Sequence, residues 1–370
     1  MVAGDFSPPP MSRNRLGPAL MAAAFLVSGA CGGDDHPAGP LGGPSRSYRM
    51  GFSAIGARPT QESALAGLAV WTPRADAAIM HVSVPYKAML TGTSASTYVN
   101  AVDLPLAQYY RDRDLELVVM LDVTDGLNRA AEAPELVELG RSITEPAVQQ
   151  VYREYAQAMA SIVRPDYLGL AAETNLIRAA APPALYAALR QMTNDVAVQL
   201  SSAGASPVLY VSVQVEAAWG RLAQTGPYQG VEQDFADFPF LRALGLSSYP
   251  YFAFAEPDEI PDDYYVRLLN GRTLPVMVVE GGWTSASVGG VTSEPATQVR
   301  YLRRQAALLD AADAHAVFQL TFSDLDAAAF NLPPGSILPL FAHLGLVSTE
   351  LQARPALAVW DSLFALRRAP

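Results

Sequence analysis

The chain is poor in the residues that build metal centres and disulfide frameworks. Its 370 residues include one cysteine, Cys31, and four histidines. A single cysteine excludes an internal disulfide and any metal site made of several cysteines. The histidines show neither HExxH nor a comparable ligand spacing. We therefore expect neither a metal nor a cofactor.

Positive charge is also scarce. The chain has 25 Lys and Arg against 36 Asp and Glu, a formal net charge of −11. No basic cluster interrupts this balance, so nucleic acid and anionic membrane surfaces are disfavoured as partners, and a neutral substrate is easier to accommodate. A glycine-rich phosphate loop is missing after every apolar run, which disfavours a doubly wound, nucleotide-binding sheet.

The N-terminal apolar stretch is shorter than the roughly 20 residues that a membrane-spanning helix needs. Arg13 and Arg15 precede it, and it runs from Ala19 to Val27. The order of basic, apolar and small residues is that of an export signal. The segment ends in Ser-Gly-Ala-Cys at 28–31, which resembles a bacterial lipoprotein processing site with Cys31 as the lipidated residue. Met11 is a second candidate for the start of this signal.

The predicted domain organisation follows from this N-terminal pattern. Residues 1–31 form the signal, and residues 32–47, rich in Gly, Pro, Asp and Ser, form a flexible linker. Residues 48–370 form one domain. The protein is predicted to be exported and anchored by Cys31 in the periplasm or at the cell surface; an ordinary secretory signal, giving a secreted protein, is the alternative.

Short apolar runs alternate with amphipathic segments along the predicted domain. Eight runs begin near Tyr48, Ala78, Leu115, Tyr167, Val208, Leu244, Pro275 and Ala316. Helices are expected between them, over 144–163, from 182 or 183 to 204, from 293 onward and over 355–366, each beginning close to a proline. The alternation predicts an α/β fold, a single-domain (β/α)8 TIM barrel.

Two of the apolar runs end on a glutamate. Residues 274–283 read Leu-Pro-Val-Met-Val-Val-Glu-Gly-Gly-Trp and contain Glu280, and residues 167–175 contain Glu173 and Asn175. The active sites of α/β barrels lie at the carboxyl ends of the strands. Two such carboxyls fit a retaining glycosidase, in which one protonates the leaving oxygen and the other attacks the anomeric carbon. A solvated, strand-capping glutamate is the alternative.

Other polar and aromatic residues follow the predicted strands and are candidates for binding a polyhydroxylated ligand. They are His81, Tyr86, Asp122, Asn175, Glu216, Trp219, Tyr249, Trp283 and Gln319. Tyr86, Trp219 and Trp283 are the candidates for stacking on a sugar ring. A core position for His81 and a loop-capping role for Asp122 remain open.

These residues together resemble a known clan. Glu173 and Glu280 on the fourth and seventh strands, with Ser-Tyr-Pro at 248–250 on the sixth, resemble the retaining (β/α)8 glycoside hydrolases, and most nearly the arabinogalactan endo-β-1,4-galactanases. The resemblance implies that Glu173 is the acid/base, Glu280 the nucleophile and Tyr249 a neighbour that orients Glu280. The clan usually has asparagine before the acid/base, where this sequence has Ala172.

The sequence therefore predicts an exported retaining glycoside hydrolase that cleaves a β-linked polysaccharide or oligosaccharide by double displacement. Two alternatives stay open. One is a glycan-binding surface lipoprotein that has the barrel without the chemistry, which Ala172 favours. The other is a different barrel enzyme, such as a hydrolase that uses Asp122 or Glu216.

Overall fold

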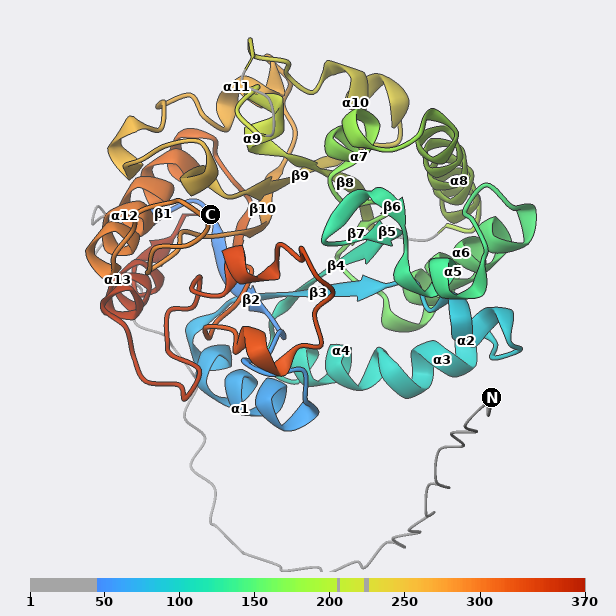
Figure 1. Cartoon of the computed structure of the whole chain (residues 1–370), viewed down its shortest axis with the longest axis horizontal. Helices are drawn as coiled ribbons and strands as arrows, with labels where there is room; N and C mark the ends of the chain where they lie inside the picture. The colour runs from blue at the N-terminus through green and yellow to red at the C-terminus, as the bar shows by residue number, and fades with distance from the viewer. Residues whose placement is uncertain (1–44, 205–206, 223–225, 370) are drawn as a thin grey trace, which may run out of the picture. The chain divides into compact units, whose positions relative to one another are not determined.

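Eight parallel strands close into a barrel in the computed structural model, which describes residues 45–204, 207–222 and 226–369 (Figure 1). The strands are β2 (Arg49–Ser53), β3 (Ala77–Ser83), β4 (Glu116–Asp122), β7 (Tyr167–Gly169), β8 (Val208–Gln214), β9 (Ala243–Ser248), β10 (Val276–Gly281) and β11 (Ala316–Gln319). Each pairs with the next in chain order, and β11 pairs with β2 to close the ring.

The barrel confirms the predicted (β/α)8 fold. Each strand begins within one residue of its predicted start. The apolar runs become strands because both of their faces are covered, one by the barrel interior and one by helices. In β4, for example, all five residues between the terminal Glu116 and Asp122 are buried.

Helices surround the barrel (Figure 1). They are α1 (Gln61–Trp71), α2 (Tyr86–Leu90), α3 (Ala95–Val102), α4 (Leu104–Arg111), α5 (Pro134–Leu139), α6 (Pro146–Ala158), α7 (Thr174–Ala180), α8 (Pro183–Ser202), α9 (Val215–Ala218), α10 (Glu232–Asp237), α11 (Val266–Leu269), α12 (Pro295–Ala311) and α13 (Pro355–Phe364). The four predicted helices correspond to α6, α8, α12 and α13. Each begins with proline, whose missing N–H would have no partner in the first turn. A π-helical turn, Met159–Val163, extends α6 to the predicted end.

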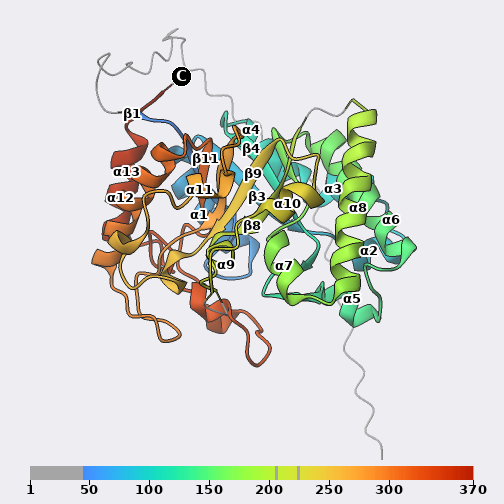
Figure 2. The same cartoon turned by 90° about the horizontal axis from the view of Figure 1, so that it is seen from above.

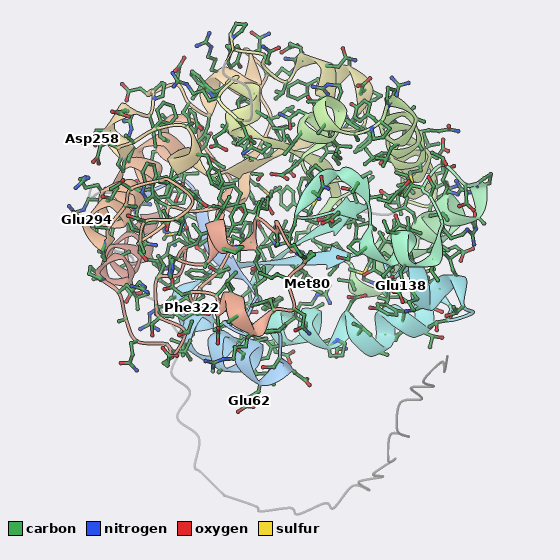
Figure 3. The ribbon with its side chains drawn as sticks, in the orientation of Figure 1. Glu62, Met80, Glu138, Asp258, Glu294 and Phe322 are labelled. Atoms are coloured by element: carbon green, nitrogen blue, oxygen red, sulfur yellow. The ribbon has the colours of Figure 1, made fainter. Side chains whose placement is uncertain are left out.

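The side chains labelled in Figure 3 differ in exposure. Met80, on β3, lies among the strands and is 3% exposed. The acidic residues labelled in the same view, Glu62, Glu138, Asp258 and Glu294, are exposed. The negative charge of the chain is therefore carried in part by the outer helices and loops.

A small parallel pair joins the two ends of the described chain, β1 (Ser45–Arg46) with β12 (Arg367–Arg368). Arg46 is 4% exposed and its guanidinium pairs with Asp76 at 2.8 Å. The folded unit thus includes Ser45 and Arg46, which we had assigned to the linker. The predicted signal, Cys31 and most of the linker lie outside the described residues.

The carboxyl end of the barrel carries the longer connections. Figure 2 shows α5, α7, α9 and the loop before α13 at this end, opposite β1 and the C-terminus. A hairpin, β5 (Thr124–Asp125) with β6 (Asn128–Glu132), and two 3-10 turns, η3 (Pro250–Phe252) and η6 (Leu338–Phe341), follow β4, β9 and β11 respectively. Among the described residues, no helix has the length and apolar character needed to cross a bilayer.

Candidate active site

A cavity of about 470 Å³ is lined by residues from the carboxyl ends of the barrel strands. This volume is typical of small-molecule sites. Its polar lining consists of His81, Asp122, Arg129, Glu173, Gln214, Tyr249 and Glu280. Within the described ranges, no cluster of three or more His, Cys, Asp or Glu side chains is arranged to hold a metal ion.

Glu280 is brought beside Ser247 by an irregularity in the barrel. Strands β9 and β10 pair in regular register up to Val278, and the next pair is Glu280 with Ser247, so Val279 is an extra residue. A bulge of this kind turns the side chains that follow it. Strands β9 and β10 approach closely here, since a Cβ on Gly281 would lie 2.4 Å from the carbonyl oxygen of Ser248.

Glu173 reaches the same point from the other side of the barrel. It follows β7 and caps the start of α7 in a left-handed conformation, with φ 48° and ψ 47°. Such a backbone is costly for a residue other than glycine, by about 1–3 kcal/mol, and is often retained at functional sites. Its amide donates a hydrogen bond of 2.9 Å to Ser212 Oγ, which fixes the residue.

The hydroxyl of Ser247 lies between the two carboxyls. Its oxygen is 2.6 Å from Glu173 Oε1 and 2.7 Å from Glu280 Oε1. Because both contacts share one oxygen, the two carboxyl oxygens are at most 5.3 Å apart. Retaining glycosidases have carboxyls about 5–5.5 Å apart, and inverting ones about 6.5–9.5 Å. This upper limit lies below the range of the inverting enzymes.

The serine also constrains where protons lie. A hydroxyl carries one hydrogen, so Ser247 can donate to only one of the two carboxyls. Its contact with the other is a hydrogen bond only if that carboxyl is protonated and donates to the serine oxygen. The geometry therefore favours one shared proton on the Glu173–Glu280 pair.

Electrostatics place that proton on Glu280. Its side chain is 15% exposed. Burial and the nearby Glu173 carboxylate raise the pKa of Glu280 from 4.5 to about 7, against the effect of Arg129. Arg129 Nε instead pairs directly with Glu173 Oε2 at 2.8 Å, and both of these side chains are under 10% exposed. Glu280 therefore holds a proton below about pH 7, while Arg129 is paired with Glu173.

Arg129 and Ser247 are site residues that our sequence reasoning missed. Arg129 comes from β6, and its second contact is Asp122 Oδ1 at 2.6 Å. A signal for this hairpin was present, since Asp and Gly, at 125 and 126, are residues that favour turns. Because the hairpin folds back, the arginine returns to the end of β4 from which the loop departs. A serine at the end of β9 gave no comparable signal.

Three predicted binding residues do line the cavity. Asp122 ends β4 and holds Arg129. His81, on β3, has its Nε2 3.8 Å from Glu280 Oε2, and burial lowers the pKa of His81 to about 4, so the ring is neutral near pH 7. Tyr249 is 4% exposed and follows β9. No hydrogen bond joins Tyr249 to Glu280, both of which are described residues, so the orienting contact that we expected from Tyr249 is made by Ser247.

The two tryptophans expected to stack on sugar are core residues instead. Trp283 is 1% exposed, packs 5.4 Å from the Tyr301 ring and donates its indole N–H to Ser293 Oγ at 3.1 Å. Trp219 is 8% exposed and donates to the carbonyl oxygen of Tyr264 at 3.1 Å. Neither lines the cavity. The left-handed Gly282, with φ 148°, turns the chain after β10 so that Trp283 packs against α12.

Four further candidates lie behind the cavity wall. Tyr86 is fully buried and donates to the carbonyl oxygen of Val123 at 3.3 Å. Gln319 is 1% exposed and donates to Gln305. Both are therefore internal packing residues and not ligand contacts as we had expected.

Asn175 and Glu216 support the cavity from outside it. The side chain of Asn175 makes two 2.8 Å hydrogen bonds to the backbone of Gln214, a residue that does line the cavity. Glu216 is fully buried and accepts a 2.7 Å hydrogen bond from the Tyr264 hydroxyl. Burial raises the pKa of Glu216 to about 7. Direct ligand contact, which we expected of both, is excluded by these positions.

No protein-family model and no curated protein sequence matches the chain. Solved structures do resemble it. Exo-β-1,4-mannosidase Op5Man5 from Opitutaceae bacterium strain TAV5 is 16% identical over 86% of this chain and 59% of its own, with a TM-score of 0.63. β-Glucuronidase from Ruminococcus gnavus, in complex with uronic isofagomine, is 12% identical over 87% of this chain and 51% of its own, with a TM-score of 0.54.

These similarities show a shared TIM-barrel fold with glycoside hydrolases. A second structure of the Ruminococcus gnavus β-glucuronidase, with uronic deoxynojirimycin, gives 13% identity, 86% and 49% coverage and a TM-score of 0.51. The chain spans 49% to 59% of the length of these proteins.

Proposed function

We propose that the protein is a retaining glycoside hydrolase that acts on a β-linked glycoside by double displacement. The observation that carries this proposal is the pair of carboxyls on one serine, with oxygens at most 5.3 Å apart, in a cavity at the carboxyl end of the barrel. The shared fold with a mannosidase and a glucuronidase supports the same class of reaction. The particular likeness to galactanases rests on the sequence motifs alone.

In the proposed mechanism the resting proton first moves through Ser247. The serine gives its hydrogen to Glu173 and takes the proton of Glu280, which leaves Glu280 ionised, Glu173 protonated and the hydroxyl restored. Substrate binding favours this state if it displaces Glu173 from Arg129. Both hydrogen bonds needed for the transfer are in place, at 2.6 and 2.7 Å.

The chemical steps then follow the usual order for two carboxyls. The Glu280 carboxylate bonds to the anomeric carbon as the bond to the leaving oxygen breaks, and Glu173 gives that oxygen its proton. In the second step Glu173 takes a proton from water. The water oxygen bonds to the anomeric carbon and releases Glu280, so the configuration is retained.

The charges in the cavity favour a neutral sugar. Arg129 is the cation among the described lining residues, and it is already paired with Asp122 and Glu173. A uronic acid would bring another negative charge beside these carboxylates without a free partner, which is costly in a buried site. The proposed substrate therefore differs in charge from the uronic ligands bound by the Ruminococcus gnavus enzyme.

Export and anchoring at Cys31 remain part of the proposal and rest on the sequence. A Cys31→Ala variant should leave the membrane fraction for the soluble exported fraction. Equal partitioning of the variant and the unmodified protein would remove the lipid anchor from the proposal.

A second candidate function is glycan binding without cleavage. Ala172 lines the cavity at the position where the resembling clan has an asparagine for the sugar 2-hydroxyl. A site that lacks this contact loses a hydrogen bond that strengthens in the transition state. Binding of an oligosaccharide without any release of product would favour this candidate.

One experiment separates the two candidates. The purified protein is incubated with a panel of β-linked polysaccharides, oligosaccharides and synthetic glycosides, and new reducing ends and the anomeric form of the first product are measured. We expect a retained product, lost in Glu173→Gln and Glu280→Gln. Glu116→Gln, a glutamate at the amino end of the barrel, is the control and should keep its activity. An inverted product would contradict the mechanism.

A further inference from the structure

Much of the cavity lining is hydrocarbon. Its apolar wall consists of Leu127, Leu176, Phe252, Leu338, Leu340 and Phe341. All six side chains are partly exposed, so they face the cavity and are not sealed into the core. Such a wall binds apolar surface and offers no hydrogen bonds to sugar hydroxyls.

The wall is ordered by aromatic contacts. The ring of Phe341 meets that of Tyr249 edge-on at 4.9 Å and that of Phe252 at 5.7 Å. These contacts join η6 to the end of β9 and to η3. The apolar surface is therefore formed before a ligand arrives, which lowers the entropy cost of binding.

Two isoleucines extend this apolar surface to the outside. Ile55 and Ile337 line the cavity and are 37% and 40% exposed. Large hydrophobic side chains that gather at the rim of a cavity indicate a binding site more than isolated exposed ones do. The rim of the cavity is thus apolar, as its wall is.

Two of the apolar side chains lie where a leaving group would depart. Leu176 is on α7, the helix that Glu173 caps, and Leu127 is in the hairpin that carries Arg129. The group bonded to the leaving oxygen must lie beside the acid that protonates it. Leu127 and Leu176 therefore place hydrocarbon beside that group.

A polymeric glycan fits this surface poorly. Sugar chains need hydrogen-bonding groups as well as aromatic platforms. The wall offers the rings of Phe252 and Phe341 but no polar side chain, and Trp219 and Trp283 are buried in the core. We propose that the protein takes glycosides of neutral sugars whose leaving group is an apolar alcohol, alkyl or aryl, and not a further sugar. This inference rests on the proposed function and narrows its substrate class.

The test compares hexyl and methyl β-glycosides of glucose, galactose and mannose. Both leaving groups are simple alkyl alcohols of similar acidity, so a difference reports contacts with the chain. Binding to the Glu280→Gln variant is measured by calorimetry, and hydrolysis is measured with the unmodified protein. We expect the hexyl glycoside of at least one sugar to bind at least tenfold more tightly than its methyl counterpart. Tenfold is about 1.4 kcal/mol, less than the burial of five methylenes supplies.

Variants at the rim identify the surface. Ile55→Ser combined with Ile337→Ser should remove most of the hexyl preference and leave methyl glycoside binding unchanged. Leu65→Ser combined with Val266→Ser is the matched control, since these side chains are 51% and 39% exposed and lie outside the cavity lining. The control should keep the preference.

The outcomes separate this inference from the proposed function. Equal binding of hexyl and methyl glycosides, or tighter binding of a trisaccharide than of any hexyl glycoside, overturns the apolar leaving group even if hydrolysis is found. A hexyl preference without hydrolysis supports the apolar surface and counts against the catalytic proposal. Absence of binding by every glycoside overturns both.

Discussion

The proton on Glu280 predicts that this residue destabilises the folded protein at neutral and alkaline pH. The folded-state pKa is about 7, against 4.5 for the free side chain. Between these values the folded state binds more protons than the unfolded state, so stability falls as the pH rises through the interval from 4.5 to 7. Below 4.5 the effect is absent, and above 7 it is complete.

Replacing Glu280 by glutamine should remove this dependence. The amide does not titrate, and it can still form a hydrogen bond with Ser247 Oγ, which lies 2.7 Å from Glu280 Oε1. A pKa of about 7 in place of 4.5 corresponds to about 3.5 kcal/mol. Glu280→Gln should thus equal the unmodified protein in stability at pH 4 and exceed it by up to about 3.5 kcal/mol at pH 8.

Urea unfolding at a series of pH values measures the difference. Glu116→Gln is the control, and its effect on stability should have the opposite sign. Burial alone would raise the pKa of Glu116, but hydrogen bonds from His315 and Arg49 outweigh it and lower this pKa. That carboxylate stabilises the protein above its unfolded pKa, so its glutamine variant should be the less stable one at pH 8. A Glu280→Gln variant that is less stable than the unmodified protein at pH 8 would refute the assignment of the proton.

Three further changes test the structure. Trp283→Ala should lower the free energy of unfolding by about 3–5 kcal/mol. Unchanged stability with weaker sugar binding would show that Trp283 contacts the ligand. Gly281→Ala should lower both stability and activity, since the new Cβ would meet the carbonyl oxygen of Ser248. Gly67→Ala is the control: it lies in α1 with open space around it and should stabilise the protein by about 0.5–1 kcal/mol. A Gly281→Ala variant more stable than Gly67→Ala would contradict the close approach of β9 and β10. Glu216→Gln should keep kcat/KM within about twofold, as a residue behind the wall, and be more stable at pH 8; a large loss of kcat would make Glu216 part of the chemistry.

A hydroxyl at position 247 is needed if the proton moves as proposed. Ser247→Ala should lower kcat at least tenfold with little change in KM, while Ser247→Thr, which keeps the hydroxyl, should recover most of it. Steady-state kinetics over a range of pH values measure kcat and KM for the three proteins. Equal kcat for Ser247→Ala and the unmodified protein would remove the serine from the proton path.

The fold was predictable because each barrel strand is an apolar run of its own. Strands buried on both faces need no alternation, so a run such as 117–121 in β4 is plain in the sequence. Proline at the start of α6, α8, α12 and α13 fixed the helix positions equally well. These signals depend only on residues close together in the chain, so a single sequence is enough to predict the strands and helices.

The site was predictable only where it coincides with a strand end. Glu173 and Glu280 could be paired because parallel strands end on one face of a barrel. The hydroxyl of Ser247 that bridges them could not be predicted, because its position depends on the extra residue Val279, which shifts the register between β9 and β10. Whether Trp283 faces a ligand or the core depends on the direction in which the chain turns at Gly282.

The roles of the two glutamates are the central claim, and the trapping of azide tests them most directly. Glu173→Ala and Glu280→Ala are each given azide and an activated dinitrophenyl β-glycoside, and proton NMR determines the anomeric form of the glycosyl azide. Glu173→Ala should give the β-azide, because azide attacks the glycosyl-enzyme on the face that the acid/base has vacated. Glu280→Ala should give the α-azide, because azide takes the place of the nucleophile. The reverse pairing, or no azide product from either variant, would contradict the account.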